Sequence, residues 1–436
     1  MYLFFNILAL FYKKLQSQIY IIKAEVNFMK KYNLIIVGGG ISAVAAAVSA
    51  ARRDLSVLII EKFGCLGGAL SNSLVYPFMR HSARGTKRNL SAGIFSEIKK
   101  RHADYGDTSW ETFKFVFDDM IEENGIDVLF HSTVFKAETE GRNIKSVSVA
   151  TKQGVLQFEA DFFIDASGDG ELIYMTGCDI QLGREKDNLC QPMTTCFRMN
   201  GVDVKLFKEE QPALNELYKK KRAEGEIKNP RENILAFAGL GDDILHLNTT
   251  RIVKHNPVDA FEVSKAEMLA RKQIFEIFDF LKTNAKSCEN ASIIYIASHI
   301  GVRESRKLKG EYILTGDDIK KMVKFEDTIA VAAYDIDIHS PDGTGTTYYV
   351  FKDGNYYYIP YRSLLPKEYD NLMVAGRCLS ADHVAHSAVR IMPTCACMGE
   401  AAGMAVALAL ESEKNAHTID IDTLRQELKK AGAVID

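Results

Sequence analysis

The sequence predicts an α/β fold in which both ends of the chain build one domain around a central parallel sheet. Residues 32–68 have the pattern of a strand, a glycine turn, a helix and a second strand, followed by another glycine pair. Residues 372–376 form a further apolar strand that ends in glycine, and the small residues of 394–410 predict a helix. The chain between these regions differs in character, so we expect an inserted α+β domain there.

We place the domain boundaries where this character changes. Residues 29–185 and 360–436 are assigned to the domain with the parallel sheet, and residues 186–359 to an inserted substrate or cap domain. A chain of 436 residues is long enough to form two such domains. We therefore expect a site between the two domains to be assembled from distant parts of the sequence.

We interpret residues 1–28 as an extension that is flexible or absent from the native protein. The apolar run 2–12 is too short to span a bilayer. The positive charges of Lys13 and Lys14 follow this run, whereas a secretory signal carries them before it. Met29 stands just ahead of the first strand, as a natural start would. A membrane-associating segment is the alternative interpretation.

Composition excludes several classes of function. The formal net charge of −3 provides no excess of Lys and Arg for a nucleic-acid surface. The eight cysteines are scattered and form no C-x-x-C pair, which is typical of buried thiols in a reducing compartment. We therefore expect a cytoplasmic protein that acts on a small molecule, with no nucleic-acid or membrane partner.

The remaining elements follow from the periodicity of apolar residues. Helices are expected at 43–53, 91–103 and 110–124, and buried strands at 55–60, 128–130 and 162–165. Residues 144–151 and 154–160 alternate between apolar and polar, which predicts a hairpin or a small meander. These elements alternate as the strands and helices of a parallel sheet do.

Three predictions concern the inserted domain. A charged helix is expected over 212–224, because Pro212 suits a first helical turn. Asp353-Gly354 between two alternating aromatic runs predicts a hairpin over 346–361. Residues 258–282 predict a helix whose core face carries Phe261, Ala266, Leu269, Ile274, Ile277 and Leu281.

The first glycine segment is a dinucleotide-binding fingerprint. Gly38 permits a tight turn out of the strand, and Gly40 lets the backbone approach a pyrophosphate. Ala43 stands where a small residue lets helix and strand pack closely. The helix that follows offers its N-terminal amides to phosphates. Glu61 ends the second strand, where an acid can bind ribose hydroxyls.

Features farther along the chain favour FAD over a nicotinamide cofactor. The second glycine pair, Gly67-Gly68, is expected where the chain passes a flavin nucleotide, and a nicotinamide enzyme does not need it. Residues 165–170 form a second strand-to-glycine turn, beside the adenosine end. Arg377 follows another such turn, where it can reach the pyrophosphate, and the helix near Thr394 can stabilise a reduced flavin. The predicted FAD-binding residues are Gly38, Gly39, Gly40, Ser42, Ala43, Glu61, Lys62, Gly67, Gly68, Val134, Ala166, Ser167, Gly168, Gly376, Arg377, Thr394 and Cys395.

With these motifs the chain resembles the FAD-dependent oxidoreductase family. The resemblance is to members with a Rossmann-like, glutathione-reductase-type FAD/NAD(P)-binding fold, in the branch related to succinate dehydrogenase flavoproteins. It runs from about Lys31 to the C-terminus and implies bound FAD and redox chemistry, but no particular substrate. Its matching stretches are 191–194, 197–198, 248–251, 301–306, 337–339, 341–343, 359–364 and 375–395.

The charges that hydride transfer requires point to candidate catalytic residues. Hydride transfer needs a base for the proton of the substrate and cations that fix a carboxylate or polarise an oxygen. We select His383, His386 and Arg390, which lie just before the predicted flavin-facing helix, together with Arg303. Packing is the alternative role for each histidine, and a structural ion pair is the alternative for Arg303 and its neighbour Arg306.

Two other constellations are weighed and set aside. Asp335, Asp337 and His339 alternate along an expected strand and face one way, which is compatible with a metal. We favour hydrogen bonds at the strand end and predict no metal. Cys395 and Cys397 diverge on a helix, so disulfide reductase activity is not expected.

The sequence therefore predicts an FAD-dependent oxidoreductase. It would move a hydride between flavin N5 and a small polar metabolite, either anionic or sugar-like. A flavin-binding component that depends on a partner or modifies RNA is one alternative, and an NAD(P)-only dehydrogenase is another. The electron donor or acceptor and the oligomeric state are left open.

Overall fold

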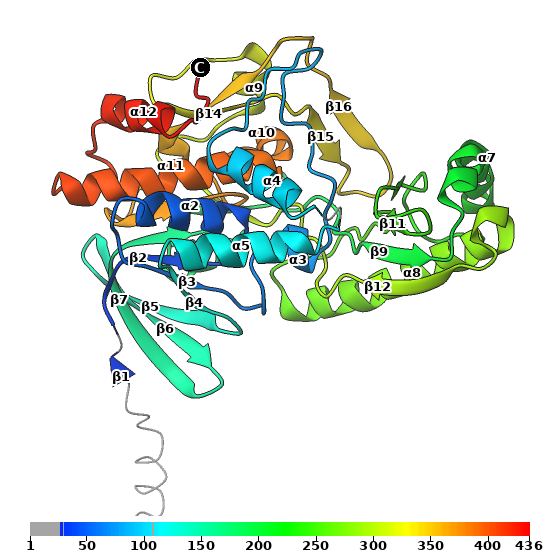
Figure 1. Cartoon of the computed structure of the whole chain (residues 1–436), viewed down its shortest axis with the longest axis horizontal. Coiled ribbons are helices and arrows are strands. Elements are labelled where there is room, and N and C mark those ends of the chain that lie inside the picture. The colour runs from blue at the N-terminus through cyan, green and yellow to red at the C-terminus, as the bar shows by residue number, and fades with distance from the viewer. Residues whose placement is uncertain (1–26, 29, 107–108) are drawn as a thin grey trace, which may run out of the picture.

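The computed structural model describes residues 27–28, 30–106 and 109–436 (Figure 1). The predicted extension, residues 1–28, lies outside the described residues except for β1 (Asn27–Phe28). β1 pairs in parallel with β7 (Gly154–Asp165), at Leu156 and Gln157.

The central sheet is parallel and contains strands from both ends of the chain. β4 (Asp127–Leu129), β3 (Val57–Ile60), β2 (Tyr32–Val37) and β7 lie side by side in that order. β18 (Leu372–Val374) pairs in parallel with the end of β7, opposite Phe163 to Asp165. The predicted α/β fold with a central parallel sheet is confirmed.

β7 also belongs to an antiparallel meander. β5 (Thr133–Glu140) pairs with β6 (Asn143–Thr151), and β6 pairs with the first half of β7. The sequence predicted separate strands at 154–160 and 162–165, whereas the structure has one continuous strand of 12 residues. β7 is long because its first half pairs in the meander and its second half in the parallel sheet.

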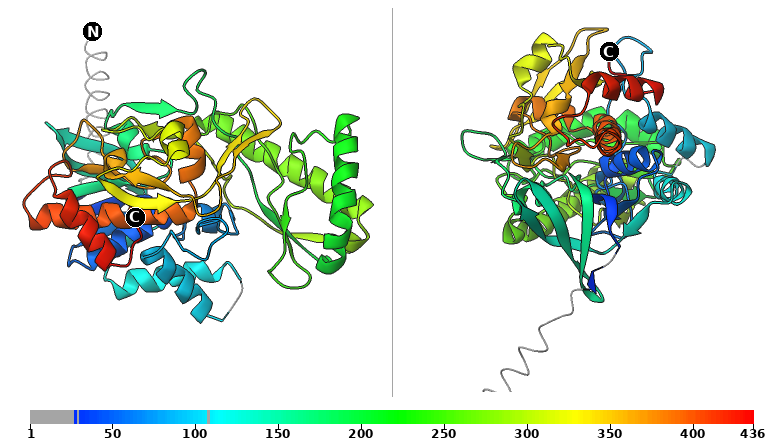
Figure 2. Two further views of the ribbon diagram at one scale, coloured as in Figure 1. Left: turned by 90° about the horizontal axis from the view of Figure 1, so that it is seen from above. Right: turned by 90° about the vertical axis from the view of Figure 1, so that its left-hand side faces the viewer.

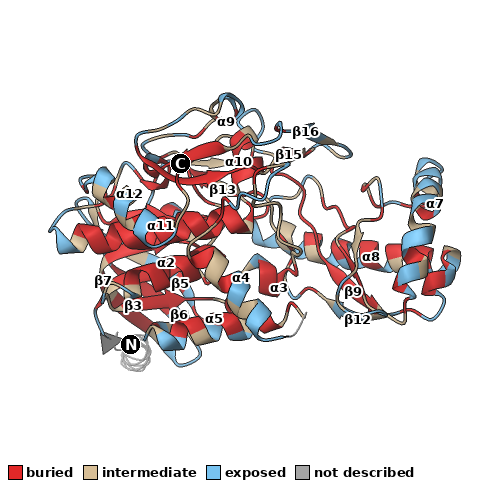
Figure 3. Ribbon diagram, turned by 45° about the horizontal axis from the view of Figure 1, so that its top comes forward, coloured by how far each residue is buried: buried red, intermediate tan, exposed pale blue. Residues whose placement is uncertain are grey.

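Four long helices lie on the side of the parallel sheet away from the meander, with α2 against the strands (Figure 1). They are α2 (Ile41–Ala51), α4 (Ile94–Asp104), α5 (Thr112–Glu123) and α11 (Met392–Glu411), with α12 (Ile421–Lys430) packed outside α11. Figure 3 shows α2 and α11 almost entirely buried. In the described part of the chain, α11 alone is long and apolar enough to cross a membrane, but it is buried inside the protein.

α11 packs directly on the backbone of α2. A Cβ added at Gly399 would lie 2.0 Å from the carbonyl oxygen of Ser42, and one at Gly403 would lie 2.1 Å from that of Ala46. The two glycines, four residues apart, face α2 on one side of α11. The sequence predicted that this helix would approach a sheet closely. The close approach is instead to a helix, because α2 lies between α11 and the strands.

A second lobe extends to one side of this body (Figure 2, left). Its four-stranded sheet has the order β10 (Ala236–Phe237), β11 (Leu245–Leu247), β9 (Phe197–Asn200) and β12 (Ser292–Ile296). The sheet packs against α7 (Val204–Ala223) and α8 (Ala260–Asn284), and the short helix η1 (Lys286–Cys288) follows α8. The lobe has a hydrophobic core of its own.

Two helix predictions for this lobe were wrong in part. α7 begins at Val204, capped by the Asp203 side chain, and Pro212 lies inside it instead of at its start. In α8, Phe261 is 80% exposed and Leu269 is 36% exposed. The buried face of α8 is rotated away from both, and consists of Ala266, Ala270, Gln273, Ile274, Ile277, Phe280 and Leu281.

The hairpin predicted over 346–361 does not form. β16 (Thr346–Tyr349) pairs with β15 (Ile336–His339), and β17 (Tyr357–Pro360) pairs with β14 (Thr328–Ala332). Each of the two aromatic segments pairs with an earlier strand and not with the other segment. Asp353 and Gly354 therefore lie between two separate strand pairs.

The strands after the lobe rejoin the main body. Ile329, Ala330, Tyr357 and Ile359 belong to the same hydrophobic core as the parallel sheet. The domain boundary at residue 359 stays a prediction. The remaining elements are α3 (Ala69–Asn72), α6 (Glu171–Met175), β8 (Ile180–Leu182), β13 (Arg306–Leu308), α9 (Gly316–Lys321), η2 (Tyr361–Leu364) and α10 (His383–Val389).

The contact between α2 and α11 predicts that Gly403→Ala destabilises the protein. Alanine is the better helix former by up to about 1 kcal/mol. The added methyl group would nevertheless force the two backbones apart, and overpacking of this kind costs about 1–3 kcal/mol. We expect a net fall in the free energy of unfolding, measured by urea denaturation. Lys272→Ala, on the exposed face of α8, is the control. A more stable Gly403→Ala variant would contradict the packing described.

A second prediction concerns Glu400, a buried acid on α11 that accepts a hydrogen bond from the backbone N–H of Ile94 at 3.0 Å. Burial raises the pKa of Glu400 from 4.5 to about 7. The folded protein therefore binds this proton more tightly than the unfolded chain, so its contribution is complete below pH 4.5 and is lost as the pH rises to about 7.

Glu400→Gln, which keeps an acceptor for Ile94, removes this titration. Relative to the wild type, the variant should gain about 3 kcal/mol of stability between pH 4.5 and 7, and the difference should then level off. Urea denaturation of both proteins across this range measures the difference. A difference that does not change with pH would show that Glu400 does not titrate in this way.

Candidate active site

A cavity of about 570 Å³ lies between the main body and the second lobe. It brings together two groups of residues that the sequence analysis took from distant segments. From the predicted catalytic set, Arg303 and Arg390 line it. From the predicted FAD-binding set, the wall contains Gly38, Gly39, Gly40, Ser42, Glu61, Lys62, Gly67, Gly68, Val134, Ala166, Ser167, Gly168, Arg377 and Cys395.

The first glycine turn combines a crowded position with an open one. Gly38 has φ +99°, and a Cβ there would lie 2.6 Å from the carbonyl oxygen of Ala166, so only glycine fits. At Gly40 a Cβ would meet no protein atom within 4 Å. The second glycine segment lies alongside, since Gly67 N–H donates to Gly39 O at 2.8 Å. The backbone of Gly40 is therefore exposed to the cavity.

Two helices begin at this cavity without a side-chain cap. α2 starts after Gly40 and has no acidic residue in its first turn. α11 starts after Ile391 and likewise has no capping side chain. Gly40, Ser42, Ile391 and Met392 line the cavity wall. Both positive helix ends can therefore act on an anionic group inside the cavity.

Glu61 and Lys62 mark the end of β3. The Glu61 carboxylate accepts from the backbone N–H of Gly39 and, at 2.8 Å, from that of Phe63. Burial raises the pKa of Glu61. Burial would lower the pKa of Lys62, but Glu171, at 2.8 Å from its Nζ, together with Asp169 and Glu61 outweighs this effect and leaves that pKa raised. Glu61 is thus fixed at the edge of the cavity, where a ribose can reach it.

Arg377 lines the cavity from the turn after β18. Its Nη2 lies 2.8 Å from Asp169 Oδ1, and its Nη1 donates to Ser305 Oγ at 2.9 Å. A Cβ at Gly168 would lie 2.9 Å from Arg377 Nη2, so the guanidinium rests on this glycine. Asp169, in the strand-to-glycine turn at residues 165–170, therefore holds this arginine at the cavity wall.

Three predicted FAD-binding residues stand behind the wall and not in it. Ala43 is fully buried in α2. A Cβ at Gly376 would lie 2.6 Å from Ser42 Oγ, so this glycine allows the chain to pass α2. Thr394 is buried in the first turn of α11. These residues support the wall, and their direct contact with a cofactor stays a prediction.

Three arginines form a cationic part of the cavity. Arg303 Nη1 donates to Pro192 O at 2.6 Å, Arg390 Nη2 to Gln191 Oε1 at 3.4 Å, and Arg231 Nε to Asn233 Oδ1 at 3.1 Å. All three line the cavity, and none forms an ion pair with a carboxylate among the described residues. Burial, together with Arg390 and Arg231, lowers the pKa of Arg303 to about 9. Their positive charge therefore remains available to a ligand.

A carboxylate and a histidine stand on the same wall. Tyr334 O–H donates to Asp337 Oδ2 at 2.9 Å, and His339 Nε2 lies 3.5 Å from the same oxygen. Burial and the nearby Arg303 lower the pKa of His339 to about 3. The imidazole is therefore neutral at neutral pH.

The three alternating residues at this position do not all face one way, as the sequence analysis expected. Asp335 lies before β15 and pairs with Arg80 at 2.9 Å and Arg84 at 2.6 Å. Only Asp337 and His339 line the cavity. In the described ranges, no group of three or more His, Cys, Asp or Glu residues is placed to hold a metal ion.

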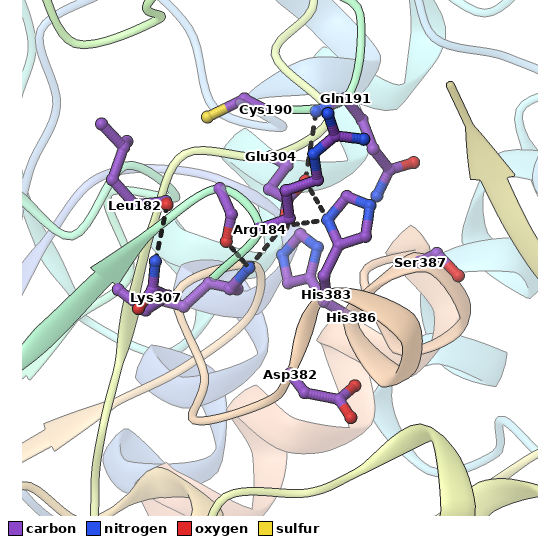
Figure 4. A network of polar contacts seen from close by, with 12 residues as sticks. Leu182, Arg184, Cys190, Gln191, Glu304, Lys307, Asp382, His383, His386 and Ser387 are labelled. Atoms are coloured by element: carbon purple, nitrogen blue, oxygen red, sulfur yellow. Dashed lines mark hydrogen bonds and ion pairs between the residues drawn. The ribbon is translucent and has the colours of Figure 1, made fainter. Parts of the chain in front are cut away.

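His383 and His386 belong to a buried polar network (Figure 4). Glu304, fully buried, binds Lys307 Nζ, accepts from Gln191 N–H at 3.1 Å, and lies 2.8 Å from His383 Nδ1. His386 Nε2 lies 2.9 Å from Arg377 O. Burial alone would raise the pKa of Glu304, but His383 and Lys307 lower it.

This network places the two histidines away from the cavity. Neither His383 nor His386 lines the wall, so the structure gives no geometric support for direct proton transfer by them. The packing role that the sequence left open fits their position better. Arg306, the other half of the predicted cationic cluster, stacks on Tyr174 at 4.1 Å and does not line the cavity. Their catalytic roles remain untested predictions.

Sequence reasoning missed most of the wall contributed by the inserted segment. Arg231, Asn233 and Tyr334 lie in stretches without a motif. Asn248 and Gly301 fall in stretches that match the family, which was the available signal. His299, Asp337 and Tyr348 also line the cavity.

The glycine turns, uncapped helices and arginines agree with the comparison to protein families. The family described as FAD-dependent oxidoreductase matches residues 33–428. The chain belongs to this family. FAD is its cofactor, and the chain is an oxidoreductase in the broad sense.

Individual relatives are distant. A glutathione reductase from Debaryomyces hansenii is 29% identical over 162 residues, which are 35% of this chain and 30% of the relative. The chain therefore matches less than a third of that protein. Among solved structures, the flavin-dependent brominase Bmp2 is 12% identical, with TM-score 0.47 and coverage of 92% of this chain and 83% of the other. A geranylgeranyl bacteriochlorophyll reductase-like protein from Thermoplasma acidophilum is 14% identical, with TM-score 0.44 and the same coverage.

The observed wall fits FAD. The open space at Gly40 allows a pyrophosphate to approach the backbone, and the uncapped start of α2 supplies N–H donors to it. Glu61 stands at the end of β3 for the ribose, and the start of α11 can act on the flavin. Residues from both ends of this chain would therefore hold FAD.

Gly40→Val tests the cofactor site. The backbone of Gly40 has φ −68°, which valine adopts, and a Cβ there would meet no protein atom within 4 Å. We therefore expect a folded protein that has lost FAD, measured as flavin absorbance at roughly 450 nm after reconstitution. Gly343→Val, which also has open space around it, is the control and should retain FAD. Full FAD occupancy in Gly40→Val would refute the phosphate role of this turn.

Proposed function

We propose that this FAD-dependent oxidoreductase transfers a hydride between FAD N5 and a small polar metabolite that carries a negative charge. One observation carries the proposal. The cavity that contains the FAD-binding glycines also contains Arg231, Arg303 and Arg390, for which the described chain supplies no carboxylate partner. Guanidinium groups that are at least partly buried favour an anion, and their planar donors bind a carboxylate in two places.

The side chains that line the cavity have two different roles. Arg303 and Arg390, anchored by Pro192 and Gln191, bind the anionic group and fix the orientation of the metabolite. The apolar side chains of Leu235, Phe237 and Met392 line the same cavity and limit the access of water. When bound, FAD supplies the acceptor or donor of the hydride.

The cellular setting is part of the proposal. All eight cysteines are free, and all but Cys65 are buried. Free buried thiols are typical of a reducing compartment. This supports a cytoplasmic enzyme, and immunolocalisation of the native protein would test it.

Arg390→Ala tests the anionic subsite. We expect an unchanged flavin spectrum, because Arg390 donates to Gln191 and is not among the residues predicted to hold FAD. Substrate-driven flavin reduction should fall about 10- to 100-fold, the effect of losing a charge-assisted hydrogen bond. The measurement is anaerobic bleaching of the flavin by a panel of hydroxy acids, sugar acids, neutral sugars and NAD(P)H.

Two further variants make this test specific. Arg390→Lys keeps the charge but not the planar donors, so it should recover only part of the rate. Arg142→Ala removes an exposed arginine that pairs with Asp370 outside the cavity, and should reduce at the wild-type rate. An unchanged rate in Arg390→Ala would assign this arginine a structural role only.

A further inference from the structure

Three arginines of the cavity keep nitrogens that no other described residue occupies. Arg231 Nη1 and Nη2, Arg303 Nε and Nη2, and Arg390 Nη1 make no hydrogen bond, and each retains accessible surface. Arg390 Nε differs from these, because it is both unbonded and closed off from solvent. Since all three side chains line the cavity, several charged donors are free for a ligand.

These arginines lie close enough to act on one another. Burial, followed by the charges of Arg390 and Arg231, lowers the pKa of Arg303 to about 9. Holding like charges together costs free energy, and an anion placed among them removes that cost. A fourth arginine nearby, Arg251, is paired with Glu232 at 3.4 Å, and neither of these two residues lines the cavity.

Asp337 balances one of the three positive charges. Burial would raise the pKa of Asp337, but His339, Arg390 and the Tyr334 hydroxyl outweigh it and leave that pKa well below its usual range, so the carboxylate is ionised. Its Oδ1 makes no hydrogen bond and is closed off from solvent, whereas Oδ2 accepts from Tyr334. Asp337 therefore acts on a ligand through its charge.

The cations at the other end of the cavity are already balanced. Lys62 Nζ lies 2.8 Å from Glu171, and Arg377 Nη2 lies 2.8 Å from Asp169. The glycine turn that is expected to bind the pyrophosphate belongs to this end, because its backbone donates to Glu61. The three arginines opposed by one carboxylate therefore keep a surplus of two positive charges when FAD is bound.

Resting on the proposed function, we infer that the substrate carries two negative charges, both of them bound by Arg231, Arg303 and Arg390. Two carboxylates or one phosphate ester meet this requirement, because both present the oxygens that planar guanidinium donors bind. A substrate with a single negative charge would leave one positive charge without a partner in a partly buried place. The site thereby favours dianions over monoanions of the same size.

Matched ligand pairs test the inference on the FAD-loaded protein. Straight-chain dicarboxylates of three to five carbons are each compared with the monoamide of equal length, which has one carboxylate fewer. Methyl phosphate and dimethyl phosphate are compared at about pH 8, where only the first is a dianion. Anaerobic calorimetry should show at least one dianion binding about tenfold or more tightly than its partner, as expected for an added charge-assisted hydrogen bond. Preference within the carboxylate pairs identifies a dicarboxylate, and preference within the phosphate pair identifies a phosphate ester.

Two variants should change this preference in opposite directions. Arg231→Gln leaves a surplus of one positive charge, so the ratio of the two affinities should fall to about one. Asp337→Asn leaves a surplus of three, so the ratio should rise above that of the wild type. Arg142→Gln removes an arginine that pairs with Asp370 outside the cavity, and should keep the wild-type ratio. The wild-type comparison is informative even if a variant fails to fold.

The possible failures are distinguishable. Equal affinities within every wild-type pair, or a preference that Arg231→Gln leaves unchanged, would overturn the dianion inference and leave the anionic subsite standing. Absence of binding by all of these ligands would overturn the anionic subsite as well, while FAD-dependent oxidoreduction itself would remain.

Discussion

The contact between α2 and α11 is the constraint on which the rest of the structure depends. Gly399 and Gly403 let the two helix backbones touch, so α11 stacks directly on α2, which itself lies on the parallel sheet. Their N-termini then open at one cavity, neither of them capped by a side chain. A wider spacing would separate these two positive ends and divide the site. Backbone proximity between distant segments is thus the basis of the cofactor site.

The cofactor half of the site could be predicted from the sequence because it depends on local backbone geometry. Gly38, Gly40 and Gly67 are required by turns whose shape is set within a few residues, and they appear as motifs. The cationic half depends on which side chains the fold leaves without partners. Arg231 carries no motif, and the unpaired oxygen of Asp337 becomes visible only when Tyr334 and His339 are placed around it. His383 and His386 show the reverse case, since their proximity in sequence to the flavin-facing helix did not bring them to the cavity wall.

The predictions were right where the burial of a strand determines its place in the fold. They were wrong where the outcome depends on which distant segment a strand or helix packs against. The strands at 57–60 and 372–374 are apolar on both faces, so their place inside a parallel sheet was clear. The hairpin at 346–361 failed because each half found a better partner in an earlier strand. Pro212 was taken as a helix start, yet Asp203 caps the helix earlier, and tertiary packing of Phe207 and Leu214 tolerates the proline. Competition between distant segments is not encoded in a local pattern.

The shared strand β7 has a consequence for how the chain folds during synthesis. Its neighbours in the parallel sheet come from residues 32–37 and 372–374, so the sheet cannot be completed until the last part of the chain has left the ribosome. Until then the edge of β7 that β18 will occupy has unpaired backbone groups, and α2 lacks the helix that covers it. Such long-range pairing forms slowly. Until it forms, unpaired strand edges that are prone to aggregation stay exposed. The growing chain therefore exposes this edge of β7 and one face of α2 until residues 372–411 have been made.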